Sequence, residues 1–433
     1  MGSARSAERA FFPLDEELAL LPGTLTPNLQ EDLVRLGAWM PFGRAAQELQ
    51  HFRGVAVSRP TAERLTEAAG AAYVTFQTAE VARIEKELPV PRAGPAKQFL
   101  SVDGAMVPLV GGEWAEVRTL VIGEVQPPVL HKGEPVIQTT HLSYFSRLTD
   151  AETFQRLALV ETQRRGVETA QAVAAVTDGA EWIPKFLAFH RHDAVRILDF
   201  PHAGEHLNRV GQAVWGEGSA ESQSWLAGQL HNLKHKGPAP VLAEVRHLAR
   251  RQPGSAAIVS NLCYLEKREN QMQYPAFLAA GWPIGDGAVE SANKLVVEAR
   301  LKGSGMHWAR PHVDPMLALR NIVCNVLWAE AWPQIMHTLR QQARQRQTAR
   351  RAKRRHSAPA LSAPTADQPQ RRPAPAVPTR TTDKTATPPG PNAPETTPTP
   401  KEPWRPAANH PWRRTPIGRA RFKVPLSQTN AKT

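Results

Sequence analysis

The nine residues Phe99-Leu-Ser-Val-Asp-Gly-Ala-Met-Val107 reveal most about the fold of this chain. Their apolar and β-branched character predicts a buried β-strand. Asp103 nevertheless lies in the middle of this stretch, and Asp is disfavoured in strand interiors. Gly104 follows it and leaves room for a ligand or another backbone to approach closely. A carboxylate kept inside such a strand indicates a functional role for Asp103.

Predicted strands and helices alternate along the sequence that follows. Gly111-Gly112 is a turn, and further strands at 114–125 and 141–148 indicate an antiparallel meander. Asp150 caps a helix that is expected to reach about residue 171. Beyond it we expect a strand at 172–177, a helix at 182–189, a strand at 195–198 and a helix at 201–214. This order predicts an α/β fold, a mixed sheet flanked by helices.

Upstream of the first strand the pattern is helical from about residue 26. Apolar residues at helical spacing predict one helix that ends at Gly54, and Ser58 with Pro60 begins a second that reaches about residue 73. A further helix is predicted at 76–92. Helix, short break and helix is the shape of a helix-turn-helix, and an ordinary helical hairpin is the alternative.

The last part of the chain changes character twice. Residues 216–280 are mainly helical and polar and are predicted to be an insertion, and helices follow at 288–301 and 315–332. After about residue 350 the apolar periodicity is lost, and Ala, Pro, Thr and Arg dominate, as in disordered chains. We therefore expect a helical region at 1–95, an α/β domain at 96–335 and a disordered, basic, Pro-rich tail at 340–433.

The net charge of +13 is concentrated in that tail. Residues 340–433 contain 20 Lys and Arg against 4 Asp and Glu, which leaves the other residues with a net charge of −3. Basic clusters in the tail suit non-specific phosphate contact, and an inert solvated tail is the alternative. Two cysteines exclude a disulfide framework and a CxxC-type zinc site, and no apolar run is long enough to span a membrane.

Three carboxylates stand apart from ordinary surface residues. Asp103 interrupts one apolar strand, Asp178 ends another and is followed by Gly179, and Glu290 lies in the first turn of a helix. Two Mg²⁺ ions held by carboxylates that converge from separate elements can catalyse an in-line phosphoryl displacement. The alternative is three unrelated carboxylates, of which those at strand ends cap helices.

The sequence blocks around these acids resemble the ISKra-type transposases of bacterial insertion sequences over about residues 10–335. The strand blocks are Ser101-Val-Asp-Gly-Ala-Met-Val-Pro108 and Gly112-Glu-Trp-Ala-Glu-Val-Arg-Thr-Leu-Val-Ile-Gly-Glu124. The middle blocks are Asp178-Gly-Ala-Glu-Trp-Ile183 and Leu198-Asp-Phe-Pro-His-Ala-Gly-Glu-His206. The last blocks are Gly287-Ala-Val-Glu-Ser-Ala-Asn-Lys294 and Arg300-Leu-Lys-Gly-Ser-Gly-Met-His-Trp308.

The resemblance implies an RNase H-like catalytic domain at 96–335 with a DDE triad of Asp103, Asp178 and Glu290. It implies two Mg²⁺ ions, with Mn²⁺ as a substitute, that these acids ligate. Asp199 is the alternative second acid. Such enzymes cut transposon ends with water and then use the freed 3′-OH to attack target DNA. We expect a homodimer or larger assembly on DNA, no membrane association, and a cytoplasmic, nucleoid-associated protein.

The resemblance also implies DNA contacts outside the triad. The helical region at 1–95 is expected to recognise transposon ends, with Arg59 and Arg64 as candidates. Lys294, Arg300 and Lys302 are candidates near the last acid. His202 and His206 are expected either to position DNA or the site or to be structural, and Trp308 is expected to pack in the core.

One departure and two alternative functions accompany this interpretation. Relatives carry a Cys-rich, zinc-binding segment upstream of the block that starts near Phe12, and we expect either a shortened N-terminus or a misplaced start. One alternative is an RNase H-like DNA nuclease without strand transfer. The other is a catalytically inactive, DNA-binding transposase remnant, although all three acids are retained.

Overall fold

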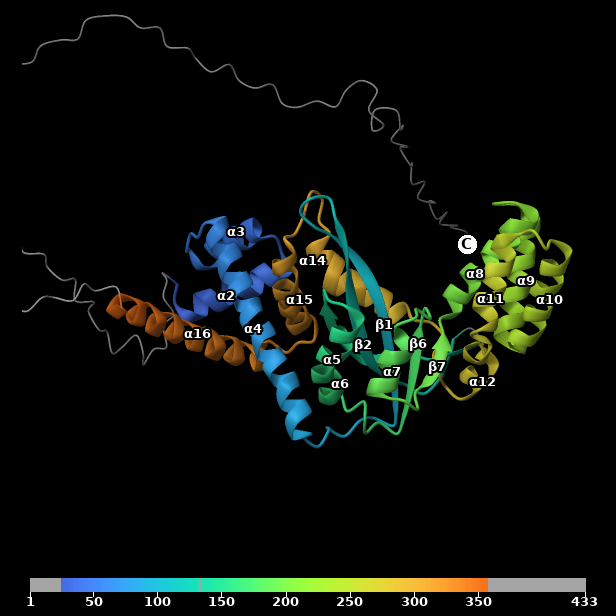
Figure 1. Cartoon of the computed structure of the whole chain (residues 1–433), viewed down its shortest axis with the longest axis horizontal. Coiled ribbons are helices and arrows are strands. Elements are labelled where there is room, and N and C mark those ends of the chain that lie inside the picture. The colour runs from blue at the N-terminus through green and yellow to red at the C-terminus, as the bar shows by residue number, and fades with distance from the viewer. Residues whose placement is uncertain (1–24, 132–133, 357–433) are drawn as a thin grey trace, which may run out of the picture. The chain divides into compact units, whose positions relative to one another are not determined.

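The computed structural model describes residues 25–131 and 134–356, and Figure 1 shows their arrangement. The first 24 residues of the predicted helical region and the part of the predicted tail beyond residue 356 lie outside the described residues. A five-stranded sheet has the order β5-β2-β1-β6-β7. Its strands are β1 (Lys97–Pro108), β2 (Trp114–Val125), β5 (Thr139–Arg147), β6 (Ala172–Thr177) and β7 (Val195–Leu198).

The sheet is mixed, as the sequence predicted. β1 pairs antiparallel with β2, and β2 pairs antiparallel with β5, which gives the expected meander. β6 pairs parallel with β1, and β7 pairs parallel with β6. A short hairpin of β3 (Val129–His131) and β4 (Glu134–Val136), which was not predicted, lies in the link between β2 and β5.

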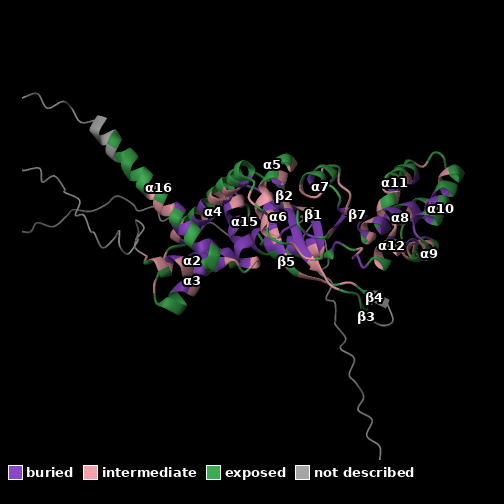
Figure 2. Cartoon of the chain, turned by 90° about the horizontal axis from the view of Figure 1, so that it is seen from below, coloured by how far each residue is buried: buried purple, intermediate pink, exposed green. Residues whose placement is uncertain are grey.

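The sheet is buried on both faces, as Figure 2 shows for its central strands. Alternate residues of β6 enter different clusters: Val173 and Ala175 belong to one, and Ala174 and Val176 to the other. A strand covered on both sides has to be continuously apolar, which is why Ala172–Thr177 contains no charged residue. Asp178 is therefore the first residue after the buried strand.

One face of the sheet is covered by short helices. They are α5 (Ala151–Leu157), α6 (Leu159–Arg164) and α7 (Ile183–His190). Asp150 caps α5 as predicted, because its carboxylate accepts a 2.9 Å hydrogen bond from the backbone N–H of Thr153. The prediction of one helix from Asp150 to residue 171 was wrong, since two short helices end at Arg164.

The opposite face carries a layer of helices that continues into the insertion. α8 (Phe200–Trp215) packs against α9 (Ala220–Lys236) and α11 (Ala256–Glu266). α10 (Pro238–Arg251), a 3-10 helix at Glu269–Gln271 and α12 (Tyr274–Ala279) complete this part. Leu207 and Val210 of α8 share a buried cluster with Val245 of α10 and Ile258 of α11. The insertion thus shares its core with the sheet.

The N-terminal helices are α2 (Pro27–Trp39), α3 (Phe42–Arg53) and α4 (Arg59–Glu87). Gly54 ends α3 in a left-handed conformation, and Ser58 caps α4, both as predicted. The separate helices predicted at 58–73 and 76–92 form one helix, which was not foreseen. A Cβ on Gly70 would lie 2.1 Å from the carbonyl oxygen of Pro315, so the absence of a side chain allows α4 to contact α15 (Arg310–Cys324) closely.

The end of the described chain differs from prediction in three ways. The segment predicted as one helix at 288–301 consists of α13 (Gly287–Ala292), a π-helix at Asn293–Glu298 and α14 (Ala299–Leu301). The helix predicted at 315–332 is two helices, α15 and α16 (Trp328–His356), because Val326 adopts a positive φ between them. Residues 340–356, predicted to be disordered, belong to α16.

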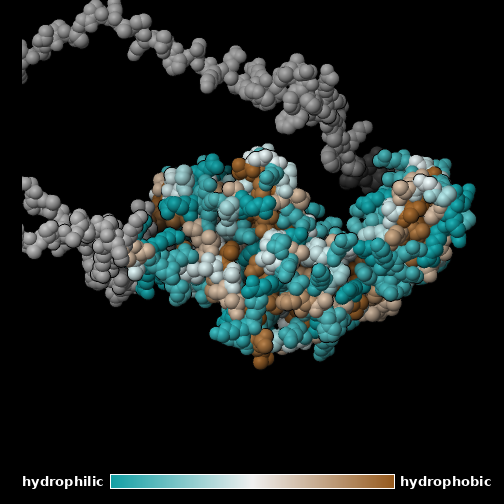
Figure 3. All heavy atoms as spheres, in the orientation of Figure 1, coloured by the Kyte–Doolittle hydropathy of each residue, from teal (hydrophilic) through white to brown (hydrophobic). Residues whose placement is uncertain are grey.

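On the face shown in Figure 3, hydrophobic residues form small scattered groups among hydrophilic ones. Within the described residues no helix combines the length and the apolar character that crossing a bilayer requires.

Candidate active site

Two carboxylates, Asp178 and Asp199, directly follow the parallel strands β6 and β7, and a third, Asp103, lies within the neighbouring strand β1. Leu100 of β1 pairs with Ala175 of β6, and Thr177 of β6 pairs with Leu198 of β7. Continuing that register brings Asp103 level with Asp178 and Asp178 level with Asp199. The carboxyl ends of parallel strands are where α/β proteins usually bind ligands. Two carboxylates predicted from the sequence, Asp103 and Asp178, are thus brought together.

The helical segment that carries Glu290 crosses this edge of the sheet. α13 packs against β1 and β2. The side-chain amide of Asn293, at the start of the π-helix, donates a 2.8 Å hydrogen bond to the Oδ2 atom of Asp103. Glu290, one turn earlier, is exposed. π-Helical turns are rare and occur frequently at functional sites, and this one places Asn293 against the central strand.

The environment of Asp103 makes its charge unfavourable. The pKa of Asp103 is raised to about 6, mainly by burial and to a smaller extent by the nearby charges of Asp178 and Glu116. The hydrogen bonds from Asn293 and from the Gly104 backbone act in the opposite direction. Crowded carboxylates of this kind are typical of catalytic and metal-binding sites, although structural networks produce them as well. The repulsion also shows that Asp178 lies close enough to Asp103 to interact with it.

Asp199 has a different environment from Asp178. Asp199 is 3% exposed, and its two oxygens accept 2.8 and 2.9 Å hydrogen bonds from the backbone N–H groups of His202 and Asp286. Asp199 therefore caps α8 and fixes the loop before α13. For Asp178, one carboxylate oxygen accepts a 3.0 Å bond from the Ala180 N–H, and the other has no donor among the described residues. Asp178 is the carboxylate with capacity for a further ligand.

Asp286 forms a coupled acid pair with Asp199. Burial raises the pKa of Asp286 to about 8, and the adjacent charge of Asp199 contributes next. The pair therefore holds one proton at neutral pH, as two buried carboxyl groups in contact generally do. Asp286 also senses the charges of Asp103 and Glu290. The charges of two predicted triad residues thus act on the acid pair that also caps α8.

A side-chain network from the insertion holds the Asp178 loop by its backbone. Tyr264 of α11 donates its hydroxyl to the carbonyl oxygen of Asp178 at 2.5 Å, and Arg268 donates to the carbonyl oxygen of Gly179 at 2.6 Å. The Arg268 guanidinium stacks 3.7 Å from the centre of the Tyr264 ring, whose other neighbour is the parallel ring of His206. The insertion therefore positions the predicted second acid.

His202 and His206 belong to that network. His206 forms a 2.6 Å hydrogen bond with Asn261 and stacks on Tyr264, and His202 contacts His206 edge to face. Both rings thus join α8 to α11, which is the structural role that the sequence left open.

The two glycines next to the acids have neighbours other than a ligand. A Cβ on Gly104 would lie 2.4 Å from a carboxylate oxygen of Glu116. Gly179 has a φ of +77°, and a Cβ there would meet Arg268 at 2.5 Å. The expected open space is therefore filled by Glu116 in one case and by Arg268 and Tyr264 in the other.

The five residues predicted to contact DNA fall into different environments. Arg59, Arg64 and Lys294 are exposed. Lys302 forms a 2.7 Å ion pair with Glu298. Arg300 is 2% exposed and lies between the rings of Phe42 and Trp308, so it is not on the surface with the others. Trp308 is 6% exposed and donates to the carbonyl oxygen of Leu301, as expected of a packing residue.

The donor atoms at this site are of the kind that Mg²⁺ prefers. Within residues 25–131 and 134–356 no three His, Cys, Asp or Glu side chains form a ready metal-binding group. The carboxylates of Asp103 and Asp178 are hard oxygen donors, and the buried Oδ1 atom of Asn293 beside them has no hydrogen-bond donor. A buried amide oxygen without a donor, next to a carboxylate with a raised pKa, suits the binding of a cation.

Sequence reasoning missed Asp286, Tyr264 and Arg268. Asp286 lies between Gly285 and Gly287, in a break that carries no strand or helix pattern. Tyr264 lies in α11 and Arg268 in the turn after it, and only the tertiary structure brings them to Asp178. The flanking glycines of Asp286 were the one available signal.

Comparison with known proteins adds no assignment. A scan against protein-family models found no match to this sequence, and a search of curated proteins found none either.

Proposed function

We propose that this protein is a DDE transposase that cuts DNA at the ends of an insertion sequence and joins the freed 3′ ends to target DNA. The observation that carries the proposal is the meeting of Asp103 and Asp178 on adjacent parallel strands beneath the helix of Glu290. The sequence blocks that resemble ISKra-type transposases surround the same three acids.

The strand arrangement supports the same proposal. A three-stranded antiparallel meander continued by two parallel strands, with helices on both faces, is the arrangement of RNase H-like domains. In such a fold the central strand and its parallel neighbour carry the first two acids, and a later helix carries the third. Asp103, Asp178 and Glu290 occupy those elements in that order.

Several side chains of this protein prepare the site for phosphoryl transfer. Asn293 orients the Asp103 carboxylate, and its hydrogen bond lowers the pKa of Asp103, although less than the Gly104 backbone bond does. Tyr264 and Arg268 fix the loop of Asp178, and the Asp199–Asp286 pair fixes the loop before α13. Positioning of this kind holds reacting groups in place before the reaction begins, which is a large part of enzymatic rate acceleration.

Asp103, Asp178 and Glu290 would hold the metal ions. Bound Mg²⁺ supplies activation of a water or 3′-OH nucleophile and stabilisation of charge on the phosphate. The carboxylates contribute negative charge that favours a cation, and the relief of their mutual repulsion strengthens that preference.

The decisive experiment combines the purified chain, a supercoiled plasmid that carries the element's ends, and Mg²⁺. Integrated products are expected from the wild-type protein, and Asp103→Asn and Glu290→Gln are expected to abolish them. Nicking without integration would instead assign the nuclease function, and binding without cleavage would assign an inactive remnant. Full activity of both variants would contradict the site assignment.

A second readout does not depend on catalysis. Mg²⁺ that binds only the folded state raises the thermal midpoint, and the stabilisation grows with the logarithm of one plus the ratio of its concentration to its dissociation constant. We expect millimolar Mg²⁺ to stabilise the wild-type protein and not the double variant Asp103→Asn, Asp178→Asn. An equal shift in both proteins would place the metal elsewhere.

A further inference from the structure

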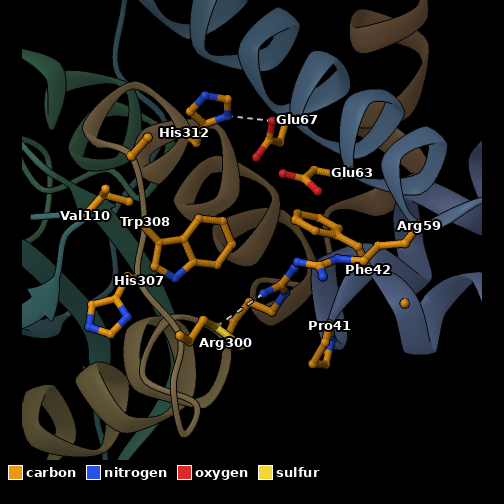
Figure 4. A pocket seen from close by; sticks show the side chains of 13 residues that line it. Pro41, Phe42, Arg59, Glu63, Glu67, Val110, Arg300, His307, Trp308 and His312 are labelled. Atoms are coloured by element: carbon orange, nitrogen blue, oxygen red, sulfur yellow. Dashed lines mark hydrogen bonds and ion pairs between the residues drawn. The ribbon is translucent and has the colours of Figure 1, made fainter. Parts of the chain in front are cut away.

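A second site lies away from the carboxylates, between the N-terminal helices and the loop before α15. It is a pocket of about 470 Å³, a volume typical of small-ligand sites. Its wall includes Arg59 of α4, Arg300 of α14, and the aromatic residues Phe42 and Trp308. Figure 4 shows the Arg59 and Arg300 side chains pointing toward one another.

Arg300 is held in this pocket with unused hydrogen-bonding capacity. It is 2% exposed, and its Nε atom donates a 3.0 Å bond to the carbonyl oxygen of Gly37. Its Nη2 atom is buried without an acceptor. Burial lowers the pKa of Arg300 to about 10, with a smaller effect of the Arg320 charge. A buried guanidinium without a carboxylate partner is costly, and an anion bound there would remove that cost.

Other groups make the same end of the pocket positive. Arg59 is exposed and forms no ion pair among the described residues. The N-termini of α3 and α15 also line the pocket, at Phe42 and at Ala309, and neither helix has a side-chain cap. An uncapped helix N-terminus carries a partial positive charge that favours phosphate, and the first turn of α3 also offers free N–H groups, whereas that of α15 contains Pro311.

The opposite side of the pocket is acidic. Glu63 and Glu67 line it, and Glu67 is bonded to His312 at 2.5 Å. In Figure 4 both carboxylates lie on the side of the pocket near His312, away from Arg300. A simple anion would be repelled by the carboxylates on this side of the pocket. A ligand with a phosphate at one end and an amino-bearing ring at the other matches both sides, since carboxylates accept hydrogen bonds from the amino group of cytosine.

We propose that this pocket binds a nucleotide, with its phosphate between Arg59 and Arg300 and its amino-bearing base toward Glu63 and Glu67. The nucleotide is either free or an unstacked unit of a DNA strand. The site stands on its own geometry, and its occupation by DNA would deepen the proposed function.

Titration calorimetry of the full chain without Mg²⁺ tests the site independently of any cleavage. We expect dCMP to bind, dTMP to bind more weakly because its O4 is an acceptor, and Arg59→Ala to weaken dCMP binding about tenfold, the effect of losing one charge-assisted bond. Arg83→Ala is the matched control, since Arg83 is an exposed arginine of the same helix outside the pocket. Equal affinity of Arg59→Ala and wild type for dCMP, or no binding at millimolar dCMP, would overturn the proposal.

Two further measurements test which side of the pocket holds the base and whether the nucleotide is free or part of a DNA strand. Glu63→Gln is expected to reduce the preference for dCMP over dTMP while pyrophosphate binding stays unchanged; an unchanged preference would refute the assignment of the acidic side. Displacement of a fluorescent single-stranded oligonucleotide by dCMP would identify a DNA strand as the source, whereas dCMP binding without displacement would identify a free nucleotide. Loss of dCMP binding in Arg59→Ala supports the site even where no integration occurs, so the two proposals fail separately.

Discussion

Asn293 donates its side-chain amide to Asp103 across a gap of 190 residues in the sequence, at a distance of 2.8 Å. The bond joins the helical segment of Glu290 to the central strand of the sheet. It stabilises the ionised form of Asp103, whereas burial and the charges of Asp178 and Glu116 disfavour that form. The protonation of Asp103 therefore depends on whether the segment of Glu290 is docked on the sheet.

Removal of the amide should raise the pKa of Asp103 further. A hydrogen bond to a carboxylate favours its charged form, so in Asn293→Ala only the Gly104 backbone bond still opposes burial and repulsion. We expect the acidic limb of the pH–rate profile for DNA cleavage to move to higher pH. Ser291→Ala, an exposed change on the same segment, should leave the profile unchanged. The same pH profile in Asn293→Ala as in wild type would show that the bond does not control Asp103.

Replacement of Asp103 by Asn should stabilise the protein at neutral pH. The folded-state pKa of about 6 lies above the ordinary value of 3.8, so ionisation of Asp103 costs stability. The cost is absent below about pH 4, develops between pH 4 and 6, and is complete above that range, where it is on the order of 1–3 kcal/mol. Asp103→Asn removes it.

The check is urea unfolding of both proteins across this pH range. The difference in unfolding free energy, variant minus wild type, should rise from pH 4 to 6 and then stay constant. A difference independent of pH would mean that Asp103 has an ordinary pKa in the folded protein. An active site that holds like charges close together lowers the stability of the folded protein, so replacing one of these residues is expected to raise it.

The two candidates for the second acid should differ in what they affect. Asp178→Asn should abolish cleavage and leave stability nearly unchanged, because Asp178 is half-buried and accepts one local bond. Asp199→Ala should cost about 1–2 kcal/mol of stability through removal of the α8 cap, and it also removes the acceptor of the Asp286 backbone N–H. Denaturation midpoints and cleavage assays on both variants make the comparison. The reverse pattern would make Asp199 the second acid.

The strands were predicted more closely than the helices, and the reason is physical. β6 is buried between helical layers, so its apolar run starts and ends where the strand does. α4 contacts α2, α3, α6, α15 and α16 on several sides, so no single apolar stripe marks its course. Its continuity through Tyr73 and Phe76 follows from these contacts and not from local sequence.

The candidate site divides in the same way. Asp103 was identifiable from the sequence because a carboxylate is unusual in the interior of an apolar strand. Asp286 was not, since its role depends on contact with Asp199, 87 residues earlier. The burial of Arg300 between Phe42 and Trp308 was equally hidden, because Phe42 comes from a helix far from both residues in the sequence.

Removal of residues 357–433 should weaken DNA binding without abolishing cleavage. That segment holds 12 Lys and Arg against 4 Asp and Glu, and fewer cations on the phosphates make binding depend less on salt. A chain ending at His356 keeps Trp332 and Ile335 of α16, which pack against α4. Binding measured from low to high salt should show a shallower slope. Loss of cleavage at every salt concentration would make the removed segment part of the enzyme.

Tyr264 and Arg268 should affect catalysis through the backbone of the Asp178 loop. Tyr264→Phe removes the hydroxyl bonded to the Asp178 carbonyl and keeps the ring that stacks on His206. We expect a loss of cleavage rate of about ten- to a hundredfold, of the size seen when supporting groups of a metal site are removed, with a higher Mg²⁺ concentration needed for half-maximal rate. Tyr73→Phe is the matched control, because the hydroxyl of Tyr73 has no hydrogen-bond partner among the described residues.

Arg268→Lys can still donate a hydrogen bond to the Gly179 carbonyl oxygen and should lose less activity than Arg268→Ala. If Tyr264→Phe changes stability but neither the rate nor the Mg²⁺ requirement, the network supports the fold and does not position Asp178.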